Sequence, residues 1–578
     1  MPNDPPVQTE TRDLIRPRLT FESITFSDGQ TLKLGDDDII VFVGPNNAGK
    51  SAALRELDHY VGRTEPQKVI TSVKIKQEGD VQTFRAWLEN NTLRVGVDGQ
   101  HSYTGMNFQI HHSHVQFFSV GQPNAHTVAT FFASRIGTDS RLTGSNPAGP
   151  RRLHFEPVEH PIHLLLTDEP LAAKISEHFS RAFGKDLIVF HGGGSQFPLM
   201  VGFRPSLLPD EHELSKRYIE SLLANSEPLA EQGDGMRAFA TILLHVLVAD
   251  NYSVQFLDEP EAFLHPPQAR LIGEYIAKER KSKAQLFVAT HSPEVLEGIL
   301  AAGSSKVRIV RIRREDSIKR IKELSREKTA TIANDPLTRF SRVLAGVFHR
   351  RVIIAESESD CLFYTAVLHS KSISGSSFPD VLFIHAGGKN RMQKLASLLR
   401  SLDVPVSVIV DIDILNDEGT FRTLFEALGG EWVAVEQDWI SLNNTVLATR
   451  PPLTADQVRN KIEAELSTVE GKQPFPKSVE RSIKSFFQGR SPWGQIKKLG
   501  RNGFDRGSPL KMFDRIAEEC GKKGLWIVPV GELEGFCRTI EARHGPDFTE
   551  KVLGERDIEA DLELHEAREF VRKVWLHE

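Results

Sequence analysis

A glycine-rich octapeptide near the N-terminus constrains this chain more than any other segment. Gly44-Pro45-Asn46-Asn47-Ala48-Gly49-Lys50-Ser51 fits the pattern GxxxxGK[ST]. It lies between an apolar run at 39–43, suited to a strand buried in a parallel sheet, and a helical pattern. Backbone N–H groups of such a loop bind phosphates, and here Lys50 would reach the β and γ phosphates while Ser51 ligates Mg²⁺. The predicted nucleotide contacts are Gly44, Asn46, Asn47, Ala48, Gly49, Lys50 and Ser51.

A pair of carboxylates completes the expected hydrolytic site. Asp258 and Glu259 follow a second buried run at 254–257. Asp258 is predicted to hold Mg²⁺ through water, and Glu259 to polarise the attacking water. Paired acids after a strand also cap helices, but the P-loop upstream favours the catalytic interpretation. His291 follows a third buried run at 286–289, where a γ-phosphate would lie, and is the predicted phosphate sensor; taken alone, a histidine is more often structural.

Two α/β patterns divide the chain, which at 578 residues exceeds what one core usually supports. We expect a first domain over 1–330 and a second over 331–578, with a helical and basic insertion at about 420–523. In the first domain, further strands are predicted at 19–26 and 31–34 as a hairpin, at 69–75, 115–120 and 187–190, and as two runs within 308–328. In the second domain, strands are predicted at 351–355, 381–385, 406–410 and 525–530.

Composition limits the cellular setting and the partners. The N-terminus has no signal-peptide pattern and no run of about 18 apolar residues occurs, so we expect a cytoplasmic protein that does not span a membrane. Cys361, Cys520 and Cys537 have neither disulfide nor zinc spacing and are expected to be reduced thiols. The net charge of -6 means that any contact with nucleic acid must come from a local basic surface.

A second group of acids follows the strands of the C-terminal half. Glu356 ends one predicted strand, Asp360 lies one helical turn later, and Asp411 and Asp413 end another strand. Strand alternation should point both aspartates the same way, so all these carboxylates would meet at one sheet edge. Like charges in close proximity require a cation, and oxygen ligands select Mg²⁺ or Mn²⁺. The sequence therefore predicts a metal site, in preference to helix caps and solvated acids.

A basic region at 477–523 contains the interleaved aromatic residues Phe486, Phe487 and Trp493. Such a region could bind a phosphate backbone and stack bases. A solvated helical face over core aromatics fits the pattern equally well.

The motif order of the first domain resembles ABC-type ATPases, and among them the SMC, RecF and OLD-like branch. The segments that carry the resemblance are the P-loop, QGDGMR at 232–237, DEPEAFLHP at 258–266 and THS at 290–292. The resemblance implies that two such domains dimerise head to tail around ATP, so that Gly233, Gly235 and Arg237 would contact nucleotide, with Gln116, in a predicted strand, as a Q-loop residue. Because Gly233 replaces the serine of the family signature, we expect slow hydrolysis or a switch that mainly binds ATP, with Arg237 supplying the missing charge.

The acids of the second domain resemble the TOPRIM fold, a small, Rossmann-like parallel sheet. The resemblance gives Glu356 the role of metal ligand or general base, and it gives metal binding to Asp411 and Asp413. Similarity to OLD (overcoming lysogenization defect) nucleases adds Asp360 at a second metal, with Glu532 or Glu534 as another ligand. Ser357 replaces the glycine that usually follows the first glutamate. The expected transition-state lysine is Lys389, Lys497 or Lys498.

An ABC-like ATPase joined to TOPRIM is the layout of OLD nucleases and of the related Gabija nuclease subunit. The resemblance implies ATP-regulated, Mg²⁺- or Mn²⁺-dependent cleavage of DNA in antiphage defence, by a homodimer or higher even oligomer, sometimes with a partner protein or a retron. Two alternatives stay open: an ATP-gated DNA-binding scaffold with an inert TOPRIM half, and a nuclease acting on RNA such as transfer RNA. Strand passage by a topoisomerase needs a tyrosine nucleophile. Tyr364 is the only tyrosine in the TOPRIM half, so a topoisomerase is disfavoured.

Overall fold

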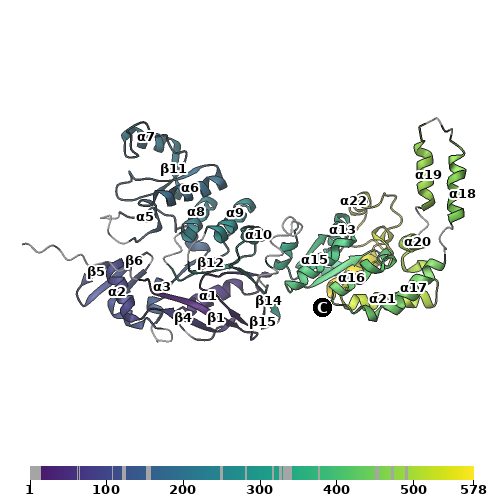
Figure 1. Ribbon diagram of the computed structural model, residues 1–578, viewed down its shortest axis with the longest axis horizontal. Helices are drawn as coiled ribbons and strands as arrows, with labels where there is room; N and C mark the ends of the chain where they lie inside the picture. The colour runs from purple at the N-terminus through teal and green to yellow at the C-terminus, as the bar shows by residue number, and fades with distance from the viewer. Residues whose placement is uncertain are drawn as a thin grey trace, which may run out of the picture. The chain divides into compact units, whose positions relative to one another are not determined.

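The protein is described here from a computed structural model (Figure 1). The structure describes residues 15–61, 63, 65–106, 108–119, 125–150, 158–247, 252–279, 283–315, 318–324, 329, 342–374, 378–449, 455–469, 471, 474–487 and 492–577. The chain forms two compact units, Met1–Phe348 and His349–Glu578. The domain boundary expected near residue 330 falls outside the described residues.

A six-stranded sheet forms the centre of the first unit, in the order β15-β14-β3-β13-β12-β8. Its strands are β3 (Ile39–Val43), β8 (Ala133–Ile136), β12 (Val254–Asp258), β13 (Gln285–Ala289), β14 (Val307–Glu315) and β15 (Ile318–Glu323). All neighbours run parallel except β14 and β15. Every residue of β3, β12 and β13 is buried, which explains why these strands are mainly apolar.

Aromatic packing fixes the three central strands relative to one another. The ring of Phe287 on β13 stacks with Phe42 on β3 and with Phe256 on β12, at centroid distances of 6.3 and 5.5 Å. The rings belong to a core cluster that includes Leu54 and Leu57 of α1. The carboxyl ends of β3, β13 and β12 are therefore held side by side.

Three small antiparallel sheets surround the central one: β2-β1-β4, β5-β6-β7 and β11-β10-β9. Their strands are β1 (Arg18–Phe26), β2 (Thr31–Lys33), β4 (Ile70–Glu78), β5 (Leu93–Val97), β6 (Gln100–Gly105), β7 (Phe108–His111), β9 (Asp186–Val189), β10 (Leu199–Gly202) and β11 (Ser226–Pro228). The helices of this unit include α1 (Lys50–Tyr60), α2 (Val81–Asn91), α3 (Ala129–Phe132), α4 (Thr138–Arg141), α5 (Pro161–Leu165), α6 (Glu169–Phe183), α7 (Lys216–Asn225), α8 (Asp234–Leu247), α9 (Pro266–Lys278) and α10 (Pro293–Ala301). The predicted hairpin is confirmed as β1 and β2.

The strand predicted at 115–120 is wrong. Residues His112–Phe117 form a 3-10 helix, and Gln116, the expected Q-loop residue, is exposed on it rather than in a strand. The His111 side chain accepts a hydrogen bond from the backbone N–H of Ser113 at the start of this helix. Local side-chain capping of this kind competes with extended backbone, and the short apolar pattern did not reveal it.

The second unit contains a parallel four-stranded sheet in the order β17-β16-β18-β19. Its strands are β16 (Arg351–Ala355), β17 (Val381–His385), β18 (Val406–Val410) and β19 (Leu525–Ile527). The first three match the prediction, whereas β19 ends before residue 530. Pro529 has no N–H to continue the ladder, and the chain turns at Gly531, where φ is 103°.

Helices cover this sheet and form a long insertion between β18 and β19 (Figure 1). They are α13 (Glu358–Leu368), α14 (Lys371–Ser374), α15 (Lys389–Ser401), α16 (Glu418–Ala427), α17 (Glu436–Ala448), α18 (Ala455–Leu466), α19 (Lys477–Phe487), α20 (Pro492–Leu499), α21 (Ser508–Lys522), α22 (Pro546–Glu555) and α23 (His565–Leu576). The insertion comprises α16 to α21, and in it α18 and α19 lie side by side. Among the described residues of both units, no helix has the length and apolar character to cross a membrane.

Candidate functional sites

The glycine-rich loop connects β3 to α1 and contains backbone conformations that residues other than glycine rarely adopt. Gly44 has a φ of 142°, and a Cβ there would lie 2.1 Å from the carbonyl oxygen of Ile312 on β14. Gly49, with a φ of 111°, precedes α1. Lys50 is 8% exposed, and its Nζ donates to the carbonyl oxygens of Gly44 at 2.8 Å and Pro45 at 3.0 Å. Burial lowers the pKa of Lys50, partly offset by neighbouring carboxylates.

The predicted acids lie at the same sheet edge as this loop. Asp258 is 8% exposed, and its Oδ1 accepts no hydrogen bond from any described residue. Glu259 has a left-handed φ of 51°, and its N–H donates to the carbonyl oxygen of Ala289 at 2.7 Å. Strained backbone at a carboxylate is characteristic of functional sites. An orphaned, buried carboxylate oxygen near the P-loop lysine suits a Mg²⁺ site of the expected kind.

Arg141 supports both acids and was not identified from the sequence. It is fully buried at the end of α4, and its guanidinium donates to the main-chain carbonyl oxygens of Asp258 and, at 2.7 Å, Glu259. Burial lowers the pKa of Arg141, while the charges of Glu261, Asp258 and Glu259 raise it. No local pattern around Arg141 signals this role, because its partners are 117 and 118 positions away in the chain.

Glu261 connects the second acid to the predicted sensor histidine. Its buried carboxylate accepts hydrogen bonds from Thr290 Oγ1 at 2.9 Å and from the His291 N–H at 2.8 Å. His291 Nδ1 lies 3.1 Å from Glu261 Oε1 and 3.7 Å from Glu259 Oε1. Burial raises the pKa of Glu261, and the contacts with His291 oppose that rise. Sequence reasoning placed Glu261 within a motif without giving it a role.

The signature segment enters α8 next to Phe263, which follows these acids in the chain. A Cβ at Gly235 would lie 2.8 Å from the carbonyl oxygen of Phe263, whereas nothing lies within 4 Å of the same position at Gly233. Arg237 donates through Nη2 to the carbonyl oxygen of Leu142 at 2.5 Å. Arg237 therefore has a partner within its own chain, which was not expected, and its contact with a nucleotide stays a prediction.

The acids of the second unit converge at the carboxyl edge of its sheet, as predicted for Glu356, Asp411 and Asp413. Lys497 Nζ lies 2.8 Å from Asp411 Oδ2 and 3.4 Å from Asp413 Oδ2. Lys389 contacts the other oxygen of Asp413 and lies 4.0 Å from Glu356 Oε2. The aspartates converge through a 3-10 turn over Ile412–Asn416 rather than through strand alternation, because β18 ends at Val410.

The electrostatics of this cluster favour a bound cation. Burial raises the pKa of Glu356 and of Asp411. Burial alone would lower the pKa of Lys497, but the surrounding acids, above all Asp411, raise its pKa overall. Glu356 Oε2 is buried and accepts no hydrogen bond from a described residue. The residues present therefore fit a divalent cation, with the lysines now neutralising part of the negative charge.

Asp360 and Ser357 form a capping box at the start of α13. Asp360 Oδ2 accepts from the Ser357 N–H at 2.8 Å, and the Asp360 N–H donates to Ser357 Oγ at 3.2 Å. Burial raises the pKa of Asp360 to about 6. Ser357 has a φ of -126°, an ordinary value for any residue, so the missing family glycine does not distort the backbone here. Thus one oxygen of Asp360 is committed to the helix cap.

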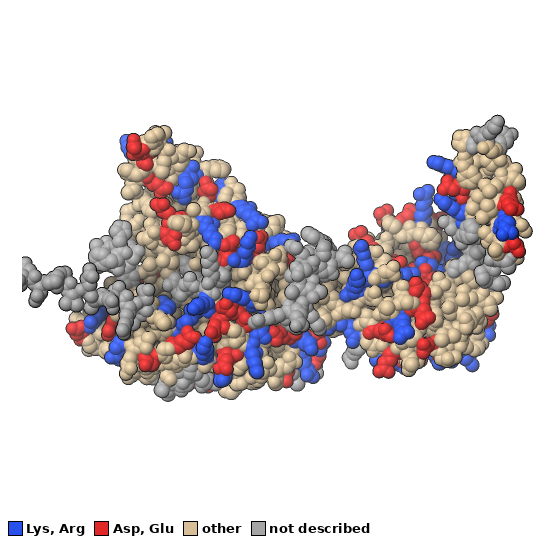
Figure 2. Space-filling model, in the orientation of Figure 1, with Lys and Arg blue, Asp and Glu red and all other residues tan. Residues whose placement is uncertain are grey.

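The basic region of the insertion is less available to bind nucleic acid than the sequence suggested, because several of its cations form ion pairs. Arg501 pairs with Asp514, Arg515 with Asp438, and Lys522 with Glu518 and Glu519. Trp493 is 1% exposed and donates to Asn443 Oδ1 at 2.8 Å, so it is a core residue. The side chains of Phe486 and Phe487 lie outside the described residues. On the face shown in Figure 2, basic side chains alternate with acidic ones.

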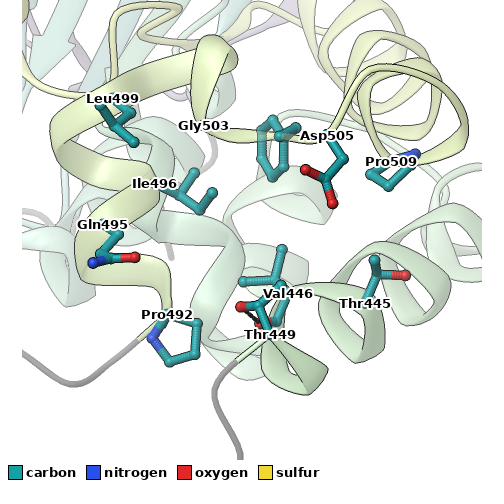
Figure 3. A pocket seen from close by; sticks show the side chains of 11 residues that line it. Thr445, Val446, Thr449, Pro492, Gln495, Ile496, Leu499, Gly503, Asp505 and Pro509 are labelled. Atoms are coloured by element: carbon teal, nitrogen blue, oxygen red, sulfur yellow. Dashed lines mark hydrogen bonds between the residues drawn. The ribbon is translucent and has the colours of Figure 1, made fainter.

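A cavity of about 130 Å³ lies inside the insertion (Figure 3). Its walls come from α17, α20 and the segment leading into α21, including Val446, Ile496 and Leu499. None of the clustered carboxylates lines it. The cavity therefore belongs to the packing beneath α20, the helix that carries Lys497, and not to the acidic site.

Tyr364 is 1% exposed in the core of the second unit, where its ring packs near Phe363 and Phe536. A tyrosine nucleophile must reach a phosphate. The burial of Tyr364 agrees with the argument against a topoisomerase.

Family models match both units. Residues 135–297 match AAA_21, an AAA domain, and residues 347–413 match the overcoming lysogenization defect protein-like TOPRIM domain. The first match contains Asp258 and His291, and the second ends at Asp413. The two matches confirm the predicted order of an ATPase domain followed by a TOPRIM domain of the OLD-like type.

Similarity to individual proteins is more distant. Over 169 residues the chain is 24% identical to the Old nuclease of Escherichia phage P2, a match that covers 28% of each chain. Among solved structures, an SmcHead bound to the C-winged helix domain of ScpA shows 13% identity and a TM-score of 0.31, covering 54% of this chain and 99% of that one. The SMC head domain from Thermotoga maritima shows 10% identity and a TM-score of 0.27, covering 54% and 100%.

Proposed function

We propose that this chain, which joins an AAA-type ATPase domain to an OLD-like TOPRIM domain, is an ATP-regulated, divalent-metal-dependent DNA endonuclease of the cytoplasm that acts in antiphage defence. The observation that carries the proposal is the meeting of Glu356, Asp411 and Asp413 with Lys389 and Lys497 at one sheet edge. Carboxylates and lysines in this arrangement are the groups that phosphodiester cleavage needs.

Each group in the cluster has a chemical task in cleavage. Bound Mg²⁺ or Mn²⁺ would supply activation of water and stabilisation of the leaving oxygen. Glu356, with its pKa raised by burial, is suited to accept a proton from the attacking water. Lys389 and Lys497 are now paired with the aspartates, and cation binding to the aspartates would free both ammonium groups to stabilise charge on the scissile phosphate.

ATP would act through the first unit. Lys50 and Ser51 would hold the phosphates, Asp258 would hold Mg²⁺ through water, and Glu259 would orient the attacking water beside His291. Gly233 offers no hydroxyl to a γ-phosphate, which supports slow hydrolysis. We infer a homodimer or higher even oligomer formed through these domains, able to work with a partner protein or a retron RNA or DNA.

The test is cleavage of supercoiled plasmid in Mg²⁺ or Mn²⁺, with and without ATP, by the intact protein, Glu356→Gln and Lys50→Ala. We expect Glu356→Gln to abolish nicking and Lys50→Ala to remove only its dependence on ATP. Parallel reactions with single-stranded RNA and transfer RNA address the RNA alternative. Absence of cleavage of every substrate by the intact protein, with ATP binding retained, would favour the DNA-binding scaffold instead.

A further inference from the structure

A second group of metal-binding side chains lies beside the acidic cluster, after the end of β19. Glu532 and Glu534 follow the turn at Gly531, and His544 lies in the loop before α22. Each residue offers one ligand atom, and these atoms all lie within 4.8 Å of one another. His544 Nδ1 is 3.2 Å from Glu534 Oε1 and 3.9 Å from Glu532 Oε1. No spacing pattern in the sequence marks His544 as a metal ligand.

The loop that carries His544 is held on both sides of the histidine. The N–H of Gly545 donates to Glu534 Oε1 at 2.8 Å, and the N–H of Arg543 donates to Asp547 Oδ2 at 2.6 Å. These contacts fix the backbone around the imidazole, although the side chain of His544 is 73% exposed. A preorganised ligand with open access suits a site that exchanges its ion with solvent.

This group adjoins the carboxylates of the proposed nuclease centre. Lys497 Nζ lies 3.8 Å from Glu532 Oε2 and 2.8 Å from Asp411 Oδ2, so the same ammonium contacts both groups. In two-metal sites the ions lie about 3.5–4 Å apart. Asp360, the expected ligand of a second ion, has one oxygen committed to the cap of α13.

We propose that His544 joins Glu532 and Glu534, the glutamates expected at the second divalent cation of this centre, as a further ligand, and that its imidazole makes this position select Mn²⁺ over Mg²⁺. The role of the ion in cleavage rests on the proposed nuclease function, but its binding does not. Mg²⁺ favours oxygen ligands and retains its waters, whereas imidazole nitrogen suits transition metals. A cation held by Nδ1 would require the proton of the neutral ring to reside on Nε2.

Binding of Mn²⁺ to the intact chain without nucleotide tests the proposal. Electron paramagnetic resonance counts bound Mn²⁺, and electron spin echo spectra detect ¹⁴N modulation from a coordinated imidazole. We expect two Mn²⁺ per chain and a clear ¹⁴N signal. His544→Ala should remove that signal and weaken one site at least about 10-fold, as losses of metal-site support typically do. It should leave the fold intact because the side chain is exposed.

His385 provides the matched control. It ends β17 in register with Ala355, the residue before Glu356, so it is another imidazole near the centre. His385→Ala should keep the ¹⁴N signal. A signal that survives in His544→Ala, or one lost in His385→Ala, would overturn the assignment, as would competition by Mg²⁺ at equal concentration.

Failure of this inference can be separated from failure of the proposed function. Glu356→Gln should lose cleavage but keep the ¹⁴N signal. If Mn²⁺ binds through His544 and the intact protein cleaves no nucleic acid, the site stands and the nuclease proposal fails. If cleavage occurs and the Mn²⁺ preference is the same in His544→Ala, only the second-ion assignment fails.

Discussion

Arg141 donates a hydrogen bond to the main-chain carbonyl oxygen of Glu259 at 2.7 Å, and its second terminal nitrogen contacts the carbonyl oxygen of Asp258. A single buried guanidinium thus fixes the backbone of both predicted ATPase acids. Glu259 has a left-handed φ, which requires such support from its surroundings.

Arg141→Lys should therefore reduce ATP hydrolysis more than ATP binding. Lysine keeps the positive charge, but it lacks the two terminal nitrogens with which the guanidinium reaches both carbonyl oxygens. Losing a hydrogen bond from a charged group costs about 1.5–3 kcal/mol. If that cost appears in the transition state, the maximal rate falls about 10- to 100-fold. Steady-state hydrolysis and nucleotide-binding titrations measure the two effects. The control is Arg135→Lys on β8, whose guanidinium lies 4.0 Å from Asp58; equal loss in both variants would contradict the role of Arg141.

Gly233→Ser should increase ATP hydrolysis several-fold, about 1 kcal/mol in the barrier, because it restores the hydroxyl of the family signature. Nothing lies within 4 Å of a Cβ at Gly233, so the fold should not change. Gly235→Ser is the matched control. A Cβ at this position would lie 2.8 Å from the Phe263 carbonyl oxygen, so the substitution should lower both the stability of the protein and its rate of ATP hydrolysis. Phosphate release and thermal unfolding provide the measurements. A Gly233→Ser protein that hydrolyses ATP no faster would show that the serine hydroxyl does not limit turnover.

Lys497→Ala should reduce DNA cleavage about 100-fold, the usual cost of removing a group that stabilises transition-state charge. The adjacent Lys498 is exposed and makes no ion pair with the clustered acids, so Lys498→Ala should cleave at the wild-type rate. Single-turnover cleavage at saturating Mn²⁺ separates the chemical step from metal binding. Similar rates for the two variants would assign the task to Lys389 instead.

The first unit should become less stable in mild acid, because the folded chain disfavours protonation of His160. Burial lowers the pKa of His160 to about 4, and its Nδ1 accepts the Ile162 N–H at 3.2 Å. Below about pH 6.5 the unfolded chain binds a proton that the folded chain excludes until about pH 4, so the free energy of unfolding falls as the pH decreases through this window. The loss approaches about 2–3 kcal/mol.

Denaturant unfolding of the intact protein and of His160→Asn between pH 7 and pH 4 checks this expectation. Asparagine can cap α5 without titrating, so the difference in unfolding free energy between the two proteins should narrow as the pH falls. A difference that stays constant across the window would exclude His160 as a source of the acid sensitivity.

The sequence by itself predicted the elements that carry chemistry. The strands preceding the P-loop, Asp258, Glu356 and Asp411 were found at their predicted positions because a strand buried in a parallel sheet is mainly apolar, and that pattern is local to the strand. The P-loop glycines are equally local, since Gly44 and Gly49 adopt backbone that other residues avoid. The strand predicted at 115–120 failed because its apolar pattern was short and a side-chain cap favoured a 3-10 turn.

Only the tertiary structure decided which distant side chains meet these elements. Arg141 is 118 positions from Glu259, and Lys497 is 84 positions from Asp413. It also assigned Trp493 to the core and placed His544 beside Glu534. Periodicity and turn chemistry report interactions between near neighbours in the chain, whereas these contacts arise when packing brings remote segments to the same sheet edge, and no single segment encodes that meeting.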